Sequence, residues 1–268
     1  MKFTTLGKTG VKVSRLCLGA MTFGYTIDEE LSHKLINRAL ELGINFFDTA
    51  NVYRRGTSEK ILGEAFKDRR DEVVIASKVF WSFSRKQEGL SRAFVLNELE
   101  DSLKRLQTDY IDIYYAHRWD TSIAPENFLR TFNHAIDQGK IHHIGVSTMH
   151  AWELAKIQWT ADKLGLTPVE IIQPNYSLLY REEEREMLPF CKDQNIAVAP
   201  WAPLAQGVLT GKYGRDGQAD TPRAKGDDIQ HWYTNATDFD IVDRVKEIAE
   251  KKGATPAQIA LAWVLSKD

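Results

Sequence analysis

The chain has 268 residues, of which 43% are hydrophobic and 27% are charged, with a formal net charge of −2. These values are ordinary for a soluble globular protein, and the small charge gives no reason to expect nucleic acid or an anionic membrane as a partner. The N-terminus has no signal-peptide pattern, and no apolar run approaches the roughly 18 residues that a membrane helix needs. We therefore expect a cytoplasmic protein in which Cys17 and Cys191 are buried, reduced thiols.

Strand-like and helix-like segments alternate along the chain, which is typical of an α/β fold with a parallel sheet. Residues 2–6 and 11–14 flank a Gly-Lys-Thr-Gly turn and predict a β-hairpin that precedes the repeat. Seven strands are then expected, at residues 15–18, 44–47, 73–77, 111–116, 141–146, 170–173 and 196–200. The helices are expected at residues 28–42, 58–67, 91–106, 125–138, 151–164, 181–194, 238–252 and 255–267, with a kink at Pro189 and a polar stretch at 212–237.

This order of elements is that of a (β/α)8 TIM barrel with an N-terminal β-hairpin, except that the eighth strand is not found. A barrel needs its last strand to close and to leave no open edge. The sequence leaves two interpretations: a barrel that lacks its eighth strand and C-terminal tail in this chain, or an open seven-stranded sheet. We favour the first, with residues 1–268 as a single, C-terminally incomplete barrel domain.

Polar residues follow three consecutive predicted strands. Asp48, Lys78 and His117 end these strands, and Tyr53 lies five residues after Asp48. Taken singly, the first three read as an Asx turn, a solvated strand end and a satisfied loop histidine, and the tyrosine as a partly buried aromatic residue. Together they favour a functional site, because the carboxyl ends of parallel strands meet at one face of the sheet.

These four residue types suit the reduction of a carbonyl group by a nicotinamide cofactor. The reaction adds a hydride to carbon and a proton to oxygen, and the protein supplies the proton. A phenol such as Tyr53 is a weak acid, with an ordinary pKa of about 10, and a nearby ammonium lowers that pKa by stabilising the phenolate. A carboxylate keeps the ammonium charged, and a histidine can orient the substrate oxygen.

The four residues lie within longer motifs. These are Asp48-Thr49-Ala50-Asn51-Val52-Tyr53 with Gly56, Ser58-Glu59 and Leu62-Gly63, then Ser77-Lys78, and His117-Arg118-Trp119-Asp120. With these motifs the chain resembles the aldo-keto reductases, and the resemblance runs from the hairpin to the last residue. The last motif resembles the aryl-alcohol dehydrogenase-like branch, and potassium-channel β subunits share the fold. The resemblance implies that Tyr53 is the general acid, that Lys78 and Asp48 tune it, and that His117 orients the carbonyl.

The same resemblance implies a bound nicotinamide cofactor. The residues it assigns to cofactor binding are Ser147, Thr148, Gln173, Trp201, Ala202, Leu204, Gln206, Gly207 and, more weakly, Arg223. Trp201 matches the residue on which the nicotinamide ring stacks. Thr148 departs from the asparagine that is usual in the family. NADPH is expected from the family, with NAD possible, because the segment that grips the adenosine end is not found.

The expected function is NAD(P)H-dependent reduction of aldehydes or ketones, with a small carbonyl compound as substrate. The resemblance to the aryl-alcohol dehydrogenase-like branch implies aromatic or aliphatic aldehydes. Two alternatives remain: a nicotinamide-binding regulatory subunit, and an inactive, truncated form. His142 and His143 point to opposite faces of a strand, so no metal site is expected. Trp152, Trp159 and Trp263 are interpreted as packing residues on helices. The sequence does not fix the oligomeric state.

Overall fold

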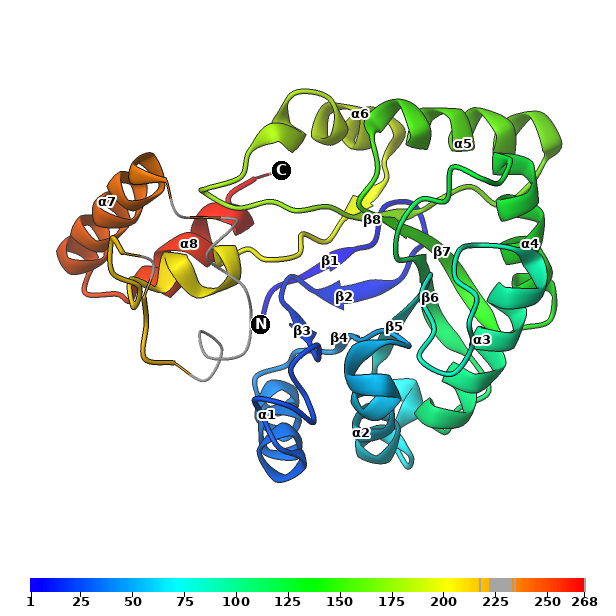
Figure 1. Cartoon of the computed structure of the whole chain (residues 1–268), viewed down its shortest axis with the longest axis horizontal. Helices are drawn as coiled ribbons and strands as arrows, with labels where there is room; N and C mark the ends of the chain where they lie inside the picture. The colour runs from blue at the N-terminus through cyan, green and yellow to red at the C-terminus, as the bar shows by residue number, and fades with distance from the viewer. Residues whose placement is uncertain (217, 222–232, 234, 268) are drawn as a thin grey trace. The chain divides into compact units, whose positions relative to one another are not determined.

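The computed structural model describes residues 1–216, 218–221, 233 and 235–267. β1 (Phe3–Thr5) and β2 (Lys12–Ser14) pair as the expected antiparallel hairpin. In the described part of the chain, seven further strands form one parallel sheet in sequential order (Figure 1). They are β3 (Cys17–Gly19), β4 (Phe46–Asp48), β5 (Val74–Val79), β6 (Ile111–Ala116), β7 (Ile141–Ser147), β8 (Ile171–Gln173) and β9 (Ala197–Val198).

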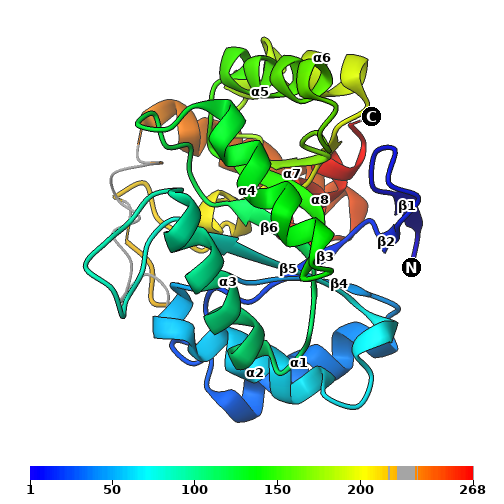
Figure 2. The ribbon, with the colours of Figure 1, turned by 90° about the vertical axis from the view of Figure 1, so that its right-hand side faces the viewer.

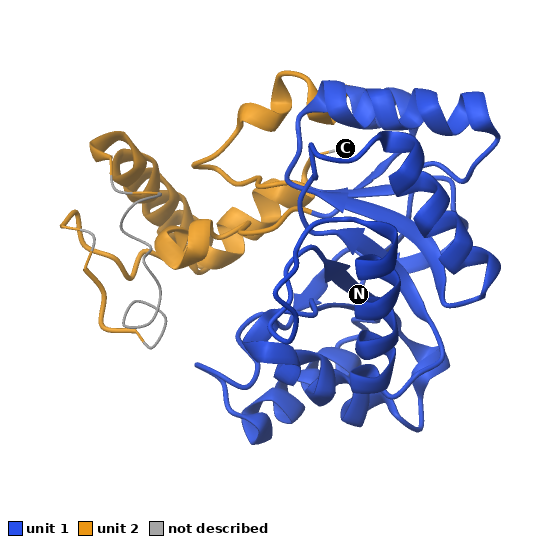
Figure 3. Cartoon of the chain, turned by 45° about the vertical axis from the view of Figure 1, so that its right-hand side comes forward, with its two compact units in different colours: residues 1–173, 190–199 blue, residues 174–189, 200–268 orange. Residues whose placement is uncertain are grey.

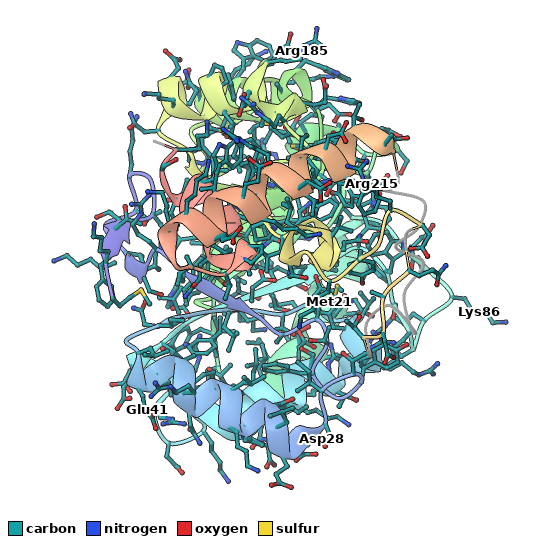
Figure 4. All side chains as sticks on the ribbon, turned by 90° about the vertical axis from the view of Figure 1, so that its left-hand side faces the viewer. Met21, Asp28, Glu41, Lys86, Arg185 and Arg215 are labelled. Carbon is teal, nitrogen blue, oxygen red and sulfur yellow. The ribbon has the colours of Figure 1, made fainter. Side chains whose placement is uncertain are left out.

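Helices connect the strands, as the alternating pattern predicts. The α-helices are α1 (Glu29–Glu41), α2 (Thr57–Phe66), α3 (Arg92–Leu106), α4 (Pro125–Asp137), α5 (Ala151–Leu164), α6 (Met187–Gln194), α7 (Ala236–Lys252) and α8 (Pro256–Leu265). Short 3-10 helices are η1 (Tyr53–Gly56), η2 (Arg70–Glu72), η3 (Glu182–Glu184) and η4 (Ala205–Thr210). Asp28 caps α1 by accepting a hydrogen bond from the backbone N–H of Leu31 at 2.8 Å, and Asp28 and Glu41 mark the two ends of that helix in Figure 4.

The parallel strands curl into a half-barrel with helices α1 to α5 on its outer side (Figure 2). Alternation along β4 gives the two sides: Phe47 packs on Phe66 of α2, with ring centroids 4.6 Å apart, whereas Phe46 joins an inner cluster. That cluster also contains Leu6 and Val13 of the hairpin, which therefore packs against the strands. The predicted (β/α)8-type fold with an N-terminal hairpin is confirmed.

The chain divides into two compact units, shown in Figure 3. The first comprises residues 1–173 and 190–199 and holds the hairpin and the whole parallel sheet. The second comprises residues 174–189 and 200–268.

The second unit has its own apolar cluster, in which η4 packs with α7 and α8. Leu209 and Val242 are fully buried there, and Ala260 of α8 joins them. Thr255 caps α8, with its hydroxyl accepting from the N–H of Gln258 at 3.2 Å. On the surface, the guanidinium of Arg215 bridges two aspartates of α7, and Figure 4 shows it beside that helix.

The prediction of one long helix over residues 181–194 with a kink at Pro189 is wrong. The chain forms η3 first, and α6 begins only at Met187, so the proline is the third residue of a new helix. A proline has no N–H to donate, and N–H groups in the first turn have no partner within the helix. The sequence therefore starts a helix around Pro189 where we expected it to bend one.

Three side chains expected to be buried are exposed. Cys17 lies on β3, which has only β4 as a strand neighbour among the described residues, so one edge of the strand is uncovered. Trp152 and Trp159 on α5 are 61% and 62% exposed, because both lie off the buried face of that helix. None of the described helices is both long and apolar enough to cross a membrane.

Candidate active site

Strand alternation brings the predicted site residues to one face of the sheet. Successive side chains of a strand point to opposite sides, so Asp48 shares the inner side with Phe46, and Lys78 shares it with Ala76. Phe46 and Ala76 both belong to the inner apolar cluster. The inner face is thus apolar near the hairpin and polar at the carboxyl ends of the strands.

Lys78 lies at the centre of this polar group. Its side chain is fully buried and forms an ion pair with Asp48. The ammonium also donates to the backbone oxygen of Thr49 at 2.7 Å and to the Tyr53 hydroxyl at 3.2 Å. The second carboxylate oxygen of Asp48 accepts from the side-chain amide of Gln173 at 2.8 Å. A buried charge needs partners of this kind, and here all three donor positions of the ammonium are used.

Tyr53 opens η1, a turn with unusual backbone geometry. The two residues after it, Arg54 and Arg55, have φ of 48° and 56°, and Gly56 has φ of 86°. Such left-handed conformations cost free energy in residues with a side chain, and they persist where the surrounding structure fixes them. The turn places the Tyr53 ring edge-on to His117, with the two ring centroids 5.7 Å apart.

The charges around Tyr53 favour its protonated form. Burial raises the pKa of the phenol, the Lys78 ammonium lowers it, Asp48 raises it again, and the net pKa is above the ordinary value. Burial alone would lower the pKa of Lys78, but Asp48 and Tyr53 raise it above the usual lysine value. The site therefore holds a neutral phenol in contact with an ammonium near neutral pH.

His117 is held neutral by its surroundings. Burial lowers the pKa of its imidazole well below the usual range, and the positive charges of Lys78 and Arg118 lower it further. Its Nδ1 atom is buried and finds no hydrogen-bond partner among the described residues. The Trp81 ring packs edge-on to it, with ring centroids 5.1 Å apart and an interplanar angle of 70°.

Three predicted cofactor residues of the first unit lie at the carboxyl ends of β7 and β8. Ser147 and Gln173 are direct neighbours in the strand register, and the Ser147 hydroxyl donates to the Gln173 backbone oxygen at 2.8 Å. Thr148 follows with φ of 52°, and its hydroxyl lies 3.2 Å from that of Ser147. Hydroxyl and amide groups in this spacing fit a carboxamide, which both donates and accepts hydrogen bonds.

The other predicted cofactor residues belong to the second unit. Trp201 forms an isolated β-bridge with Asn175 within that unit. The loop after it is irregular, with positive φ at Ala202, Ala205, Gln206 and Gly207. Leu204 precedes η4. Arg223 lies outside the described residues. A cofactor role for these residues stays a prediction.

Two residues next to the site were not predicted from the sequence. Trp81 contacts His117, and Glu98 of α3 is a fully buried carboxylate that accepts a hydrogen bond from Asn51 at 2.7 Å. A signal for Glu98 was present: it lies three residues after Val95 and one before Leu99, on the apolar face of its helix. A carboxylate on such a face needs a buried partner.

Comparison with known proteins identifies the class of protein as an oxidoreductase. Residues 15–268 match the Aldo/keto reductase family, and the chain belongs to that family. Proteins of this family generally use nicotinamide cofactors.

Several curated relatives align along almost the whole chain. A Schizosaccharomyces pombe protein named as an aryl-alcohol dehydrogenase is 36% identical over 98% of this chain and 84% of its own length. The versiconal hemiacetal acetate reductase of Aspergillus parasiticus is 36% identical over 99% of this chain and 86% of its own. A protein of Arabidopsis thaliana named "Probable voltage-gated potassium channel subunit beta" is 36% identical over 99% and 84%. The chain is thus similar to both the enzyme and the channel-subunit branches of the family.

Proposed function

We propose that the protein reduces aldehydes or ketones to alcohols with NADPH, and that Tyr53 donates the proton. The observation that carries this proposal is the position of Lys78, whose ammonium contacts the Tyr53 hydroxyl and forms an ion pair with Asp48. Few structural needs explain a fully buried lysine that joins a carboxylate to a phenol.

Each residue then has one task. Tyr53 gives its proton to the carbonyl oxygen, and the Lys78 ammonium stabilises the phenolate that forms. Asp48 keeps the ammonium charged and fixed. Neutral His117 donates a hydrogen bond that orients the carbonyl oxygen beside Tyr53, which is consistent with its lowered pKa.

A bound nicotinamide cofactor supplies the hydride. We propose that Ser147, Thr148 and Gln173 hold its carboxamide, since their polar groups lie together at two adjacent strand ends. The further contacts that we propose are Trp201, Ala202, Leu204, Gln206, Gly207 and Arg223. A preference for NADPH over NADH is part of this proposal.

Aromatic aldehydes are the proposed substrate class. Trp81 lies against His117, and the Phe80 and Trp81 ring centroids are 5.0 Å apart, so aromatic surface borders the imidazole. Flat aromatic groups pack well on such surfaces. The aryl-alcohol dehydrogenase name of one relative supports the same class.

The test is the oxidation of NADPH and of NADH in the presence of an aromatic aldehyde, with an aliphatic aldehyde for comparison. The proposal expects turnover with the aromatic aldehyde and a lower KM for NADPH than for NADH. Absence of turnover by folded protein that binds NADPH would contradict it.

A regulatory role is the second candidate, because relatives of similar identity carry the name of a potassium channel subunit. Under that candidate the protein would bind NADPH and associate with a channel, while turnover stayed negligible. Measured turnover separates the two, and the four site residues favour the enzyme.

A further inference from the structure

A buried carboxylate ties together the segments that carry Tyr53, Lys78 and Trp81. Glu98 lies in the middle of α3, and its side chain is 1% exposed. Its Oε2 atom accepts from the Asn51 amide at 2.7 Å. Its Oε1 atom accepts from the Ser82 hydroxyl at 2.8 Å and from a guanidinium nitrogen of Arg85. One carboxylate thus binds donors from two loops.

Asn51 connects these loops to each other. Its side-chain nitrogen donates to Glu98 and also to the backbone oxygen of Trp81 at 2.6 Å. Its backbone N–H donates to the backbone oxygen of Lys78 at 3.2 Å. Both acceptors of the amide are oxygens, so the orientation of the Asn51 side chain is fixed. Asn51 lies two residues before Tyr53, and it binds the backbone of the Trp81 segment at two points, Lys78 and Trp81.

The loop after Trp81 is tied to α3 by a second set of contacts. The Ser82 hydroxyl accepts from the backbone N–H groups of Ser84 and Arg85, which forms a tight turn. The Arg85 guanidinium is shared between Glu98 and Asp101, its Nη2 atom lying 2.6 Å from Oδ2 of Asp101. Charge-assisted bonds of this kind hold geometry more strongly than neutral ones.

We propose that Glu98 is a positioning residue that fixes Trp81 against His117, through Asn51 on one side and through Ser82 and Arg85 on the other. The Trp81 ring reaches His117 only if the backbone at Trp81 stays where Asn51 holds it. Asn51 in turn has its free N–H satisfied by Glu98. The hydrogen bonds of Glu98 go to Asn51, Ser82 and Arg85, so Glu98 acts on the Trp81 and His117 rings through these three residues.

The proposal predicts two separable effects of Glu98→Gln, a change that keeps the shape and removes the charge. The carboxylate accepts three hydrogen bonds, from Asn51, Ser82 and Arg85, whereas the amide nitrogen of a glutamine accepts none, so at least one of the three is lost. The loop after Trp81 should open more often, and aromatic substrates should bind less well. The second effect depends on the proposed reductase function, whereas the first does not.

Limited trypsin digestion tests the loop directly. Lys86 is exposed, and Figure 4 shows its side chain pointing away from the protein, so the bond after it is a natural cleavage site once the loop opens. Mass spectrometry would follow cleavage of the Lys86–Gln87 bond. We expect Glu98→Gln to raise its rate roughly tenfold, the effect of losing one hydrogen bond to a charged group. Glu100→Gln, on the same helix but paired with Lys140, is the matched control and should leave the rate unchanged.

Steady-state kinetics tests the link to the site. For an aromatic aldehyde, Glu98→Gln should raise KM roughly tenfold with a much smaller change in kcat, and should leave NADPH binding unchanged. Asp101→Asn removes the charge of the second partner of Arg85 and leaves the contact between Glu98 and Asn51 intact, so it should raise cleavage after Lys86 but raise KM less than Glu98→Gln does.

The outcomes are distinguishable. Cleavage of Glu98→Gln at the wild-type rate would overturn the proposal, whatever the kinetics. Equal KM changes in Glu98→Gln and Asp101→Asn would also overturn it, because the path through Asn51 would then be unnecessary. A wild-type protein without turnover would contradict the proposed function alone, since the digestion would still report on Glu98.

Discussion

The Lys78 ammonium nitrogen lies 3.2 Å from the Tyr53 hydroxyl oxygen, although the two residues are 25 positions apart in the sequence. The fold brings them together. Lys78 ends the inner face of β5, and Tyr53 follows β4 through a turn of left-handed residues. The ion pair with Asp48 compensates for the burial of the ammonium. The contact is therefore the product of two adjacent parallel strands and one strained turn.

The lowered pKa of His117 predicts a flat acid limb of the pH–rate profile. A group whose pKa is depressed stays neutral above that value, so the donor form of the imidazole is present throughout pH 6 to 8. We expect kcat/KM for reduction to show no inflection near the usual histidine pKa of about 6.5. An inflection there in the wild type, absent from His117→Gln, would contradict the assignment.

The lowered pKa of His117 also makes the stability of the folded protein depend on pH. The unfolded chain binds a proton at His117 as the pH falls below about 6.5, whereas the folded protein does not, so this contribution to stability is present above that pH and lost below it. Between pH 8 and pH 5, the melting temperature should fall less steeply in His117→Gln than in the wild type. Parallel curves for the two proteins would show that the imidazole is not buried in its neutral form.

Thr148→Asn should stabilise the protein. Thr148 has φ of 52°, a left-handed conformation that is unfavourable for a β-branched residue and well tolerated by asparagine. We expect a gain of about 1 kcal/mol in the free energy of unfolding, measured by denaturant titration. Thr148→Val keeps the β-branch and serves as the control without gain. Equal stability of the Asn and Val variants would show that the backbone is not strained here.

Gly145→Ala should destabilise the half-barrel. A methyl group at Gly145 of β7 would lie 2.6 Å from Cε1 of Tyr115, a fully buried ring on the inner side of β6. Overpacking of this kind costs about 1–3 kcal/mol. Gly19→Ala is the matched control in a strand, because nothing lies within 4 Å of the added carbon. Similar melting temperatures for the two variants would contradict the close packing of Gly145 on Tyr115.

Much of the fold could be predicted from local patterns. Strands β4 to β8 are apolar runs followed by helical spacing, and each was expected within a few residues of its observed position. The start of α6 just before Pro189 could not be predicted locally, because a proline bends a helix or lies in the first turn of one depending on the turn before it. The exposure of Cys17 depends on which strand edge is covered, and that is a property of the sheet and not of the residue.

The part of the site that lies at the ends of the strands could be predicted from the sequence, and the part contributed by the neighbouring loop could not. Asp48, Lys78 and His117 follow strands that pair in order, so their proximity comes from topology. The position of Trp81 depends on how a loop folds back on a helix, which no local pattern encodes, whereas the place of Glu98 on the apolar face of α3 did give a local signal. The direction of the Tyr53 pKa was also beyond the sequence, since burial outweighs the lowering by Lys78.

The role of Tyr53 as proton donor is tested by the single-turnover rate of aldehyde reduction by Tyr53→Phe, with NADPH affinity measured in the same samples. Phenylalanine keeps the ring beside His117 and removes only the hydroxyl. We expect a loss of about 10²–10⁴-fold in rate, the usual contribution of a general acid, with NADPH affinity unchanged. A rate equal to that of the wild type would show that the proton comes from another group.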